Sequence, residues 1–74
     1  MTEQPTELKR LASIAADLEL SAGMRTKAVE LLGKIGTRDA LLVLLELAAN
    51  EELVPEERDL ALRQARGIIR ARRG

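Results

Sequence analysis

The sequence predicts an all-α protein whose four helices form two stacked antiparallel hairpins. Three observations predict this fold class. Strong helix formers dominate the 74 residues, which include few β-branched residues and no aromatic residue. Apolar residues recur every three or four positions in four segments that Gly, Pro or Ser separate. The chain also aligns with itself after a shift of 33 residues, which is typical of stacked helical units.

The first helix is expected to begin at Pro5 and Thr6 and to run to a break at residues 21–23. Its apolar residues follow one another at three- and four-residue steps, so they share one side of the helix: Leu8, Leu11, Ala15 and Leu18. The opposite side is polar and consists of Lys9, Ser13 and Asp17. This pattern indicates a helix with one buried side and one solvated side.

The second helix is expected to end at Gly36, because glycine adopts the left-handed conformation that follows a helix most easily. Its apolar side comprises Met24, Ala28, Leu31, Leu32 and Ile35. Its solvent side comprises Thr26, Glu30 and Lys34. Thr37 is then placed to cap the start of a third helix through its hydroxyl.

The third segment, from Arg38 to about Asn50, is apolar around most of its circumference. Only a narrow polar strip interrupts it, made of Asp39, Glu46 and Asn50. A helix that is apolar nearly all round is buried from several sides, so we expect this helix to be the central one, with Leu44 in the core.

The fourth helix is expected to begin at Pro55, since proline is tolerated in the first turn of a helix. Acidic residues in that turn complement the helix dipole: Glu56, Glu57 and Asp59. The inward side of this helix is predicted to comprise Ala61, Leu62, Ala65, Ile68 and Ile69. Arginines occupy its last turns, which also agrees with the dipole.

The internal repeat divides the chain, a single domain of residues 1–74, into one hairpin at about 6–36 and another at about 37–71. Nine of the 28 aligned positions from Leu8 to Ile35 are identical in the two copies. The matches include Leu11 with Leu44, Arg25 with Arg58, Ala28 with Ala61 and Ile35 with Ile68. Each copy is therefore predicted to be one helical hairpin.

Residues 24–36 resemble the second helix of a HEAT or HEAT-like repeat, with an Arg, an Ala three residues later and then Leu-Gly-Lys-Ile-Gly. Residues 37–47 are similar to the first helix of the next repeat. The second copy departs from this pattern, since Arg66 and Gly67 replace Gly33 and Lys34. The resemblance implies a non-catalytic scaffold whose second helices line a binding surface.

Two architectures remain open at this point: a HEAT-like right-handed α-α superhelix and a compact four-helix bundle. Two repeats are fewer than the three or so that a stable solenoid usually needs. We therefore favour a compact domain, with a homodimer that covers the open ends or a fragment of a longer array as the alternatives.

The exposed side of the two second helices is the first candidate for a site. The resemblance makes it a partner surface for another protein or for a second copy of the chain. The candidate partner-binding residues are Lys27, Glu30, Lys34, Leu60 and Arg63. Leu60 lies outside the main apolar side of its helix and so suggests a contact, whereas solvation alone explains the charged residues, helped by a Glu30–Lys34 pair.

A stripe of arginines on the last helix is the second candidate, because arginine binds phosphate oxygens through two parallel hydrogen bonds. The stripe comprises Arg63, Arg66, Arg70 and Arg73, and Arg72 lies on another side. It predicts an alternative function, the binding of nucleic acid or another polyanion. The absence of aromatic side chains disfavours single-stranded nucleic acid, and the helix dipole or an Asp59–Arg63 pair also accounts for these arginines.

Composition makes an enzyme the least favoured class. The chain has no Cys and no His, so thiol nucleophiles, histidine bases and the usual zinc ligands are absent. The acidic pairs around Pro55 lack the alternating oxygen ligands of a calcium loop. We therefore expect no catalytic residue, no metal, no cofactor and no small-molecule substrate.

The same composition bears on location and on one further class of protein. The longest apolar run, residues 40–45, is too short to span a bilayer, and the first five residues are acidic and polar. A cytoplasmic protein without membrane contact is expected. A helical adaptor of the death-domain kind stays open as a further alternative, although such a domain would have five or six helices.

Overall fold

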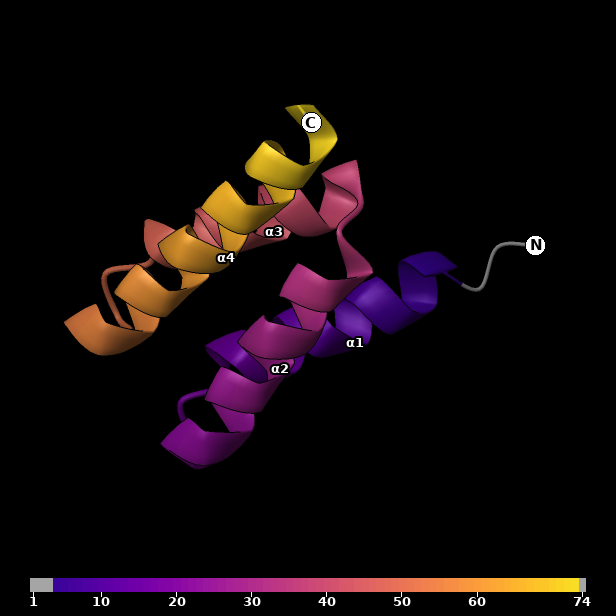
Figure 1. Ribbon diagram of the computed structural model, residues 1–74. Coiled ribbons are helices and arrows are strands. Elements are labelled where there is room, and N and C mark those ends of the chain that lie inside the picture. Colours follow the sequence, from indigo (N-terminus) through magenta and orange to yellow (C-terminus); the bar gives the residue numbers. More distant parts are fainter. Residues whose placement is uncertain (1–3, 74) are drawn as a thin grey trace.

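The computed structural model describes residues 4–73, with side chains from residue 7 onward, and this part of the chain forms four helices and no strand (Figure 1). The helices are α1 (Gln4–Ala16), α2 (Ala22–Ile35), α3 (Arg38–Ala48) and α4 (Pro55–Arg73). The predicted all-α fold class and number of helices are confirmed. Among the described helices, none has both the length and the apolar character needed to cross a bilayer.

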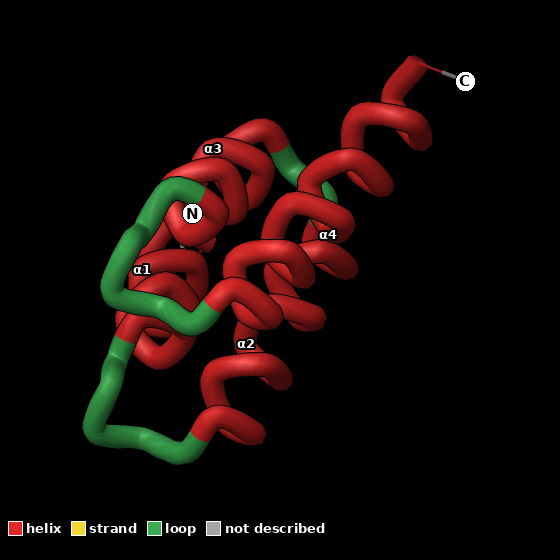
Figure 2. The backbone as a smooth tube through the Cα atoms, turned by 90° about the vertical axis from the view of Figure 1, so that its left-hand side faces the viewer, coloured by secondary structure: helices red, strands yellow, loops and turns green. Residues whose placement is uncertain are grey.

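The four helices are arranged as two antiparallel hairpins that lie side by side, α1 with α2 and α3 with α4. Figure 2 shows α1 and α3 in one layer and α2 and α4 in the other. Both α2 and α3 contact each of the other three helices, whereas α1 and α4 do not contact each other within the described residues. The molecule is consequently flat, measuring 33 × 27 × 17 Å.

Local capping fixes the boundary between the two hairpins where the sequence predicted it. Gly36 has a φ of 65°, and its N–H donates to the carbonyl of Leu32 at 3.3 Å. The hydroxyl of Thr37 accepts a hydrogen bond from the N–H of Ala40 at 3.1 Å. The predicted end of α2 at Gly36 and the predicted cap of α3 at Thr37 are therefore confirmed.

The turn between α1 and α2 differs from the prediction. The first helix ends at Ala16, and the Asp17 carboxylate accepts a hydrogen bond from the N–H of Glu19, which stabilises a turn. Leu18 therefore lies outside the helix with 51% of its surface exposed, not on the buried side of α1. Ser21 does not interrupt a helix but caps α2 by accepting from the N–H of Met24.

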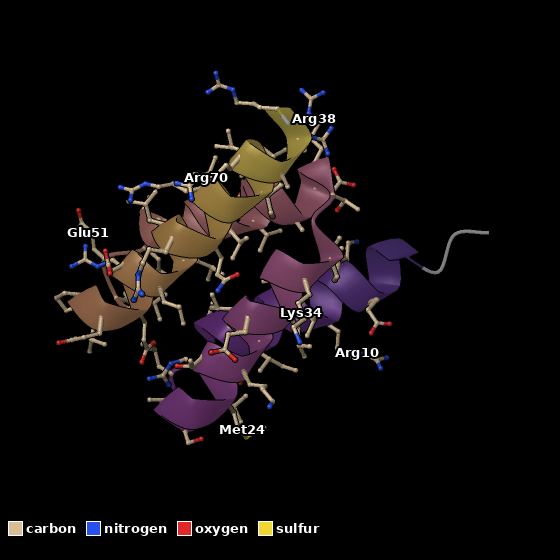
Figure 3. All side chains as sticks on the ribbon, viewed as in Figure 1. Arg10, Met24, Lys34, Arg38, Glu51 and Arg70 are labelled. Atoms are coloured by element: carbon tan, nitrogen blue, oxygen red, sulfur yellow. The ribbon has the colours of Figure 1, made fainter. Side chains whose placement is uncertain are left out.

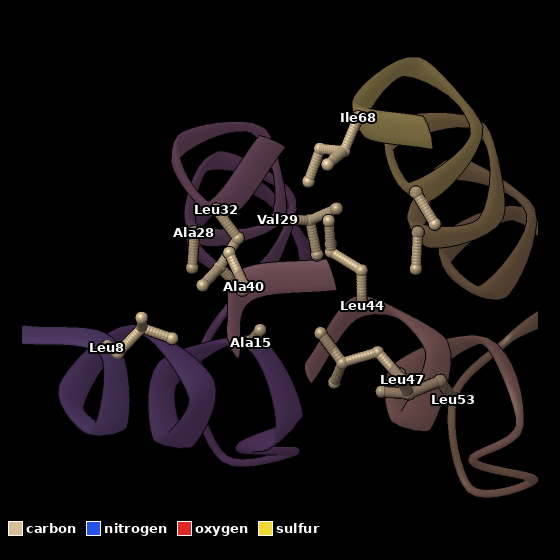
Figure 4. Packing of buried hydrophobic residues seen from close by; sticks show 12 residues of the cluster. Leu8, Ala15, Ala28, Val29, Leu32, Ala40, Leu44, Leu47, Leu53 and Ile68 are labelled. Carbon is tan, nitrogen blue, oxygen red and sulfur yellow. The ribbon is translucent and has the colours of Figure 1, made fainter. Parts of the chain in front are cut away.

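The core lies between the two layers and is built from small and branched aliphatic side chains. In Figure 4, Val29 of α2, Leu44 of α3 and Ile68 of α4 point toward one another. The buried apolar residues are Leu8, Ala15, Ala28, Val29, Leu32, Ala40, Leu44, Leu47, Leu53, Ala61, Ala65 and Ile68. Val29 was not predicted, and it takes the place that the sequence assigned to Met24 and Leu31, which are exposed.

The expectation that α3 is the central helix, buried from several sides, is confirmed only in part, since α3 contacts each of the other three helices but keeps one apolar side exposed. Leu44 has no exposed surface, but Leu42 is 50% exposed and Leu45 is 39% exposed. The buried residues Ala40, Leu44 and Leu47 share one side of α3, and Leu42 and Leu45 lie on the side turned away from them. For the same reason Ile69, predicted to point inward, is exposed on the side of α4 that no described helix covers.

The leucines of α3 provide a test of this packing. Leu44→Ala should lower the free energy of unfolding by about 2–5 kcal/mol, because it leaves a cavity in the core. Leu42→Ala, the same truncation at an exposed position two residues away, should change it by about 0.5 kcal/mol or less. Urea unfolding monitored by circular dichroism measures both. Equal losses for the two variants would contradict the packing described here.

Candidate interaction surfaces

The helices α2 and α4 form one layer of the molecule. Their outer sides carry the predicted partner-binding residues. Lys27, Glu30 and Lys34 are exposed on α2, and Arg63 is exposed on α4. The two helices contact each other directly and form one layer of the molecule (Figure 2), so these exposed residues all come from the same layer. The structure therefore brings together four of the five residues in an exposed layer of mixed charge.

Leu60, the fifth of these residues, has a structural role. It is partly buried and packs against the core, which accounts for an apolar residue off the main apolar side of α4. Of the two predicted pairs of charged residues, Asp59–Arg63 forms and Glu30–Lys34 does not. Arg63 Nε donates to Asp59 Oδ2 at 3.1 Å, whereas the side chains of Glu30 and Lys34, both described, do not form an ion pair. Lys34 and Glu30 are therefore free to meet solvent or a partner.

A buried ion pair joins the two hairpins, and it was not predicted. Arg25 Nε donates to Glu57 Oε1 and Arg25 Nη2 donates to Glu57 Oε2, each at 2.9 Å. The side chains are 11% and 9% exposed. The hydrogen bonds that Arg25 donates to Glu57 raise the pKa of Arg25 above its ordinary value, against a lowering by burial. This two-pronged geometry is the strong form of an arginine–carboxylate pair.

Arg25 also holds the turn of its own hairpin. Its Nη1 donates to the carbonyl of Leu20 at 2.6 Å and to that of Asp17 at 3.2 Å. One guanidinium thus connects the α1–α2 turn, the start of α2 and the start of α4. Because the ion pair and these hydrogen bonds act together, they fix how α2 lies beside α4.

A second close contact between α2 and α4 lies nearer to the C-terminal end of α2, at Gly33. A Cβ atom placed on Gly33 would collide with the Gln64 side chain of α4. Gly33 therefore lets the Gln64 side chain lie close against α2. The matching residue of the second hairpin is Arg66, which is exposed and faces no such neighbour among the described helices.

The arginine stripe is exposed along α4, as predicted. Arg66, Arg70 and Arg73 line, with Ile69, an open groove of about 430 Å³ near the C-terminal end of the helix. Arg38, at the start of α3, lies at the same end of the molecule (Figure 3). Arg63 stands apart because its guanidinium is engaged by Asp59. The structure thus separates three groove arginines from the fourth member of the stripe.

Comparisons with known proteins do not identify a relative of this chain. Neither the models of protein families, nor the curated protein sequences, nor the solved structures contain a match to this chain. Within the described residues, no group of three or more acidic side chains is arranged to hold a metal ion. The described surface therefore consists of exposed charged and apolar side chains on two packed hairpins.

Proposed function

We propose that this chain is a non-catalytic protein–protein interaction module that binds its partner on the outer side of α2 and α4. One observation carries the proposal: α2 and α4 lie side by side, held by the Arg25–Glu57 pair, and present Lys27, Glu30, Lys34 and Arg63 to solvent. A surface that is fixed before binding loses little conformational entropy when a partner docks. The resemblance to HEAT-like repeats supports the same side of the molecule.

Charge reversal tests this surface. The triple variant Lys27→Glu, Lys34→Glu, Arg63→Glu should abolish capture of the partner and shift the midpoint of thermal unfolding little, because all three side chains are exposed. Affinity capture with the immobilised chain, followed by calorimetric titration of the captured protein, measures the first effect, and circular dichroism measures the second.

The matched control reverses three exposed basic residues on the other layer: Lys9→Glu, Arg10→Glu, Arg38→Glu. This variant should bind the partner as the unmodified chain does. Equal loss of binding in both variants would contradict the assignment of the surface to α2 and α4. A large fall in the unfolding midpoint of the first variant would show that its residues support the fold instead.

The groove between Arg66, Arg70 and Arg73 favours a second candidate function, the binding of a polyanion such as duplex DNA. Three guanidinium groups around one open groove can each contact a phosphate. Ile69 contributes an apolar side chain to the lining of the same groove.

Titration with duplex DNA at low salt tests this second function. If three arginines each contact a phosphate, the logarithm of the binding constant should fall with the logarithm of salt concentration with a slope of about −2.7. Arg70→Glu with Arg73→Glu should abolish binding, whereas Arg63→Glu, whose side chain pairs with Asp59, should weaken it less. Fluorescence anisotropy measures the affinities. Absence of binding at low salt would exclude this function.

A further inference from the structure

Arg58 is the residue of the second hairpin that matches Arg25, 33 positions later in the chain. Its Nε is buried and has no hydrogen-bond partner among the described residues. Arg25, by contrast, donates to one carboxylate and two backbone carbonyls. A buried donor without a partner is rare and costly in folded proteins, so the surroundings of Arg58 require an explanation.

Arg58 lies on the side of α4 that faces away from the first hairpin. Glu57 and Gln64 face α2, since one pairs with Arg25 and the other lies against Gly33. At about 100° per residue, Arg58 and Leu62 are turned by about 100° and 140° from Glu57. The buried Ala61 lies between these two directions. Arg58 and Leu62 therefore lie at the edge of the buried side of α4, away from α2, and both are partly exposed.

Residues of α3 also belong to this part of the molecule. Val43 lines a groove of about 290 Å³ together with Leu8 and Ala12 of α1, so it faces the first hairpin. Leu45 is turned by about 200° from Val43 and lies on the opposite side of α3, where it is exposed. We call this region the end surface: Leu41, Leu45, Arg58 and Leu62.

The residues of the end surface stand at the same repeat positions as the residues through which the first hairpin contacts the second. Its four residues match Leu8, Ala12, Arg25 and Val29, in that order. Leu8 and Ala12 lie beside α3, Arg25 pairs with Glu57, and Val29 points toward α3 and α4 (Figure 4). The second hairpin thus carries the same set of residues, including the arginine, and among them Leu45 is exposed while Leu41, Arg58 and Leu62 are partly exposed.

We propose that the end surface is a docking site for a helical hairpin from outside these 74 residues, whose second helix begins with a Glu or Asp at the place of Glu57. The carboxylate of that helix accepts from the guanidinium of Arg58, a side chain that is partly exposed, as Glu57 accepts from Arg25. The apolar side chains of the incoming hairpin cover Leu41, Leu45 and Leu62. Docking that turns the Arg58 Nε toward this carboxylate removes the cost of the unpartnered donor.

A second copy of this chain does not have the required chemistry. Its open first hairpin presents an apolar groove of about 160 Å³, lined by Leu11, Ile14, Met24, Lys27, Ala28 and Leu31. Met24 and Lys27 occupy the places of Glu57 and Leu60. A second copy stacked in the same way would bring a thioether and a cation to Arg58 in place of a carboxylate, so charge complementarity favours a different hairpin.

The end surface is distinct from the outer side of α2 and α4 proposed above as a partner surface. Its residues are contributed by other sides of α3 and α4, and either surface can bind without the other. A failed test of the charge-reversal variants therefore leaves this proposal standing, and the reverse also holds.

The full chain itself supplies a probe with the required chemistry. Met24→Glu with Lys27→Leu gives the first hairpin the residues that Glu57 and Leu60 provide in the second. This variant should associate head to tail, about tenfold or more tightly than the matched Met24→Gln, Lys27→Leu control, because only the carboxylate pairs with Arg58. Adding Arg58→Met should abolish the difference. Sedimentation velocity over a range of concentrations measures the association. Equal association of the Glu and Gln variants would overturn the proposal.

A second measurement needs no associating variant. Arg58→Met in the otherwise unmodified chain should leave the midpoint of thermal unfolding unchanged or raise it, because it replaces an unpartnered buried donor with an apolar side chain. Arg25→Met, the same substitution at the matching position, should lower the midpoint, because it leaves Glu57 without its partner. Equal losses for the two variants would show that Arg58 has a partner within the chain and would also overturn the proposal.

Discussion

The ion pair between Arg25 and Glu57 is the interaction on which the arrangement of the two hairpins depends. Burying charges is costly, and a buried pair is stable only when its geometry is good and its remaining donors are satisfied. Arg25 meets both conditions, since it uses two prongs on the carboxylate and donates to two carbonyls of the preceding turn. The exposed Arg63–Asp59 pair, within one helix, has no comparable effect on how helices are placed.

Close packing between the layers complements this pair. Alanines occupy buried positions on all four helices, which lets backbones approach without aromatic side chains to fill wider gaps. Gly33 serves the same purpose where α2 meets Gln64 of α4. With α2 and α4 fixed in this way, their outer sides form one surface of exposed charges, and the uncovered sides of α3 and α4 form another.

Local features of the sequence predicted much of this structure, and features that depend on neighbouring helices did not follow from it. Gly36 and Thr37 were predictable because capping needs only adjacent residues. Leu42 and Ile69 were misplaced because their exposure depends on which helices lie beside them. The exposure of Lys27 and Arg63 followed from helical periodicity. Glu57 was missed because the helix dipole already explained an acid there, and its partner lies 32 residues away. The sequence feature that could have pointed to a structural role for Arg25 was its match with Arg58 in the internal repeat.

The most direct test of this account is a double-mutant cycle on the pair that joins the hairpins. Arg25→Met, Glu57→Gln and the double variant give the coupling free energy of that pair from urea unfolding. The same cycle on Arg63 and Asp59 provides the reference for an exposed pair. The account predicts a clearly larger coupling between Arg25 and Glu57, because that pair is buried and spans the two hairpins. A coupling no larger than that of the exposed pair would contradict it.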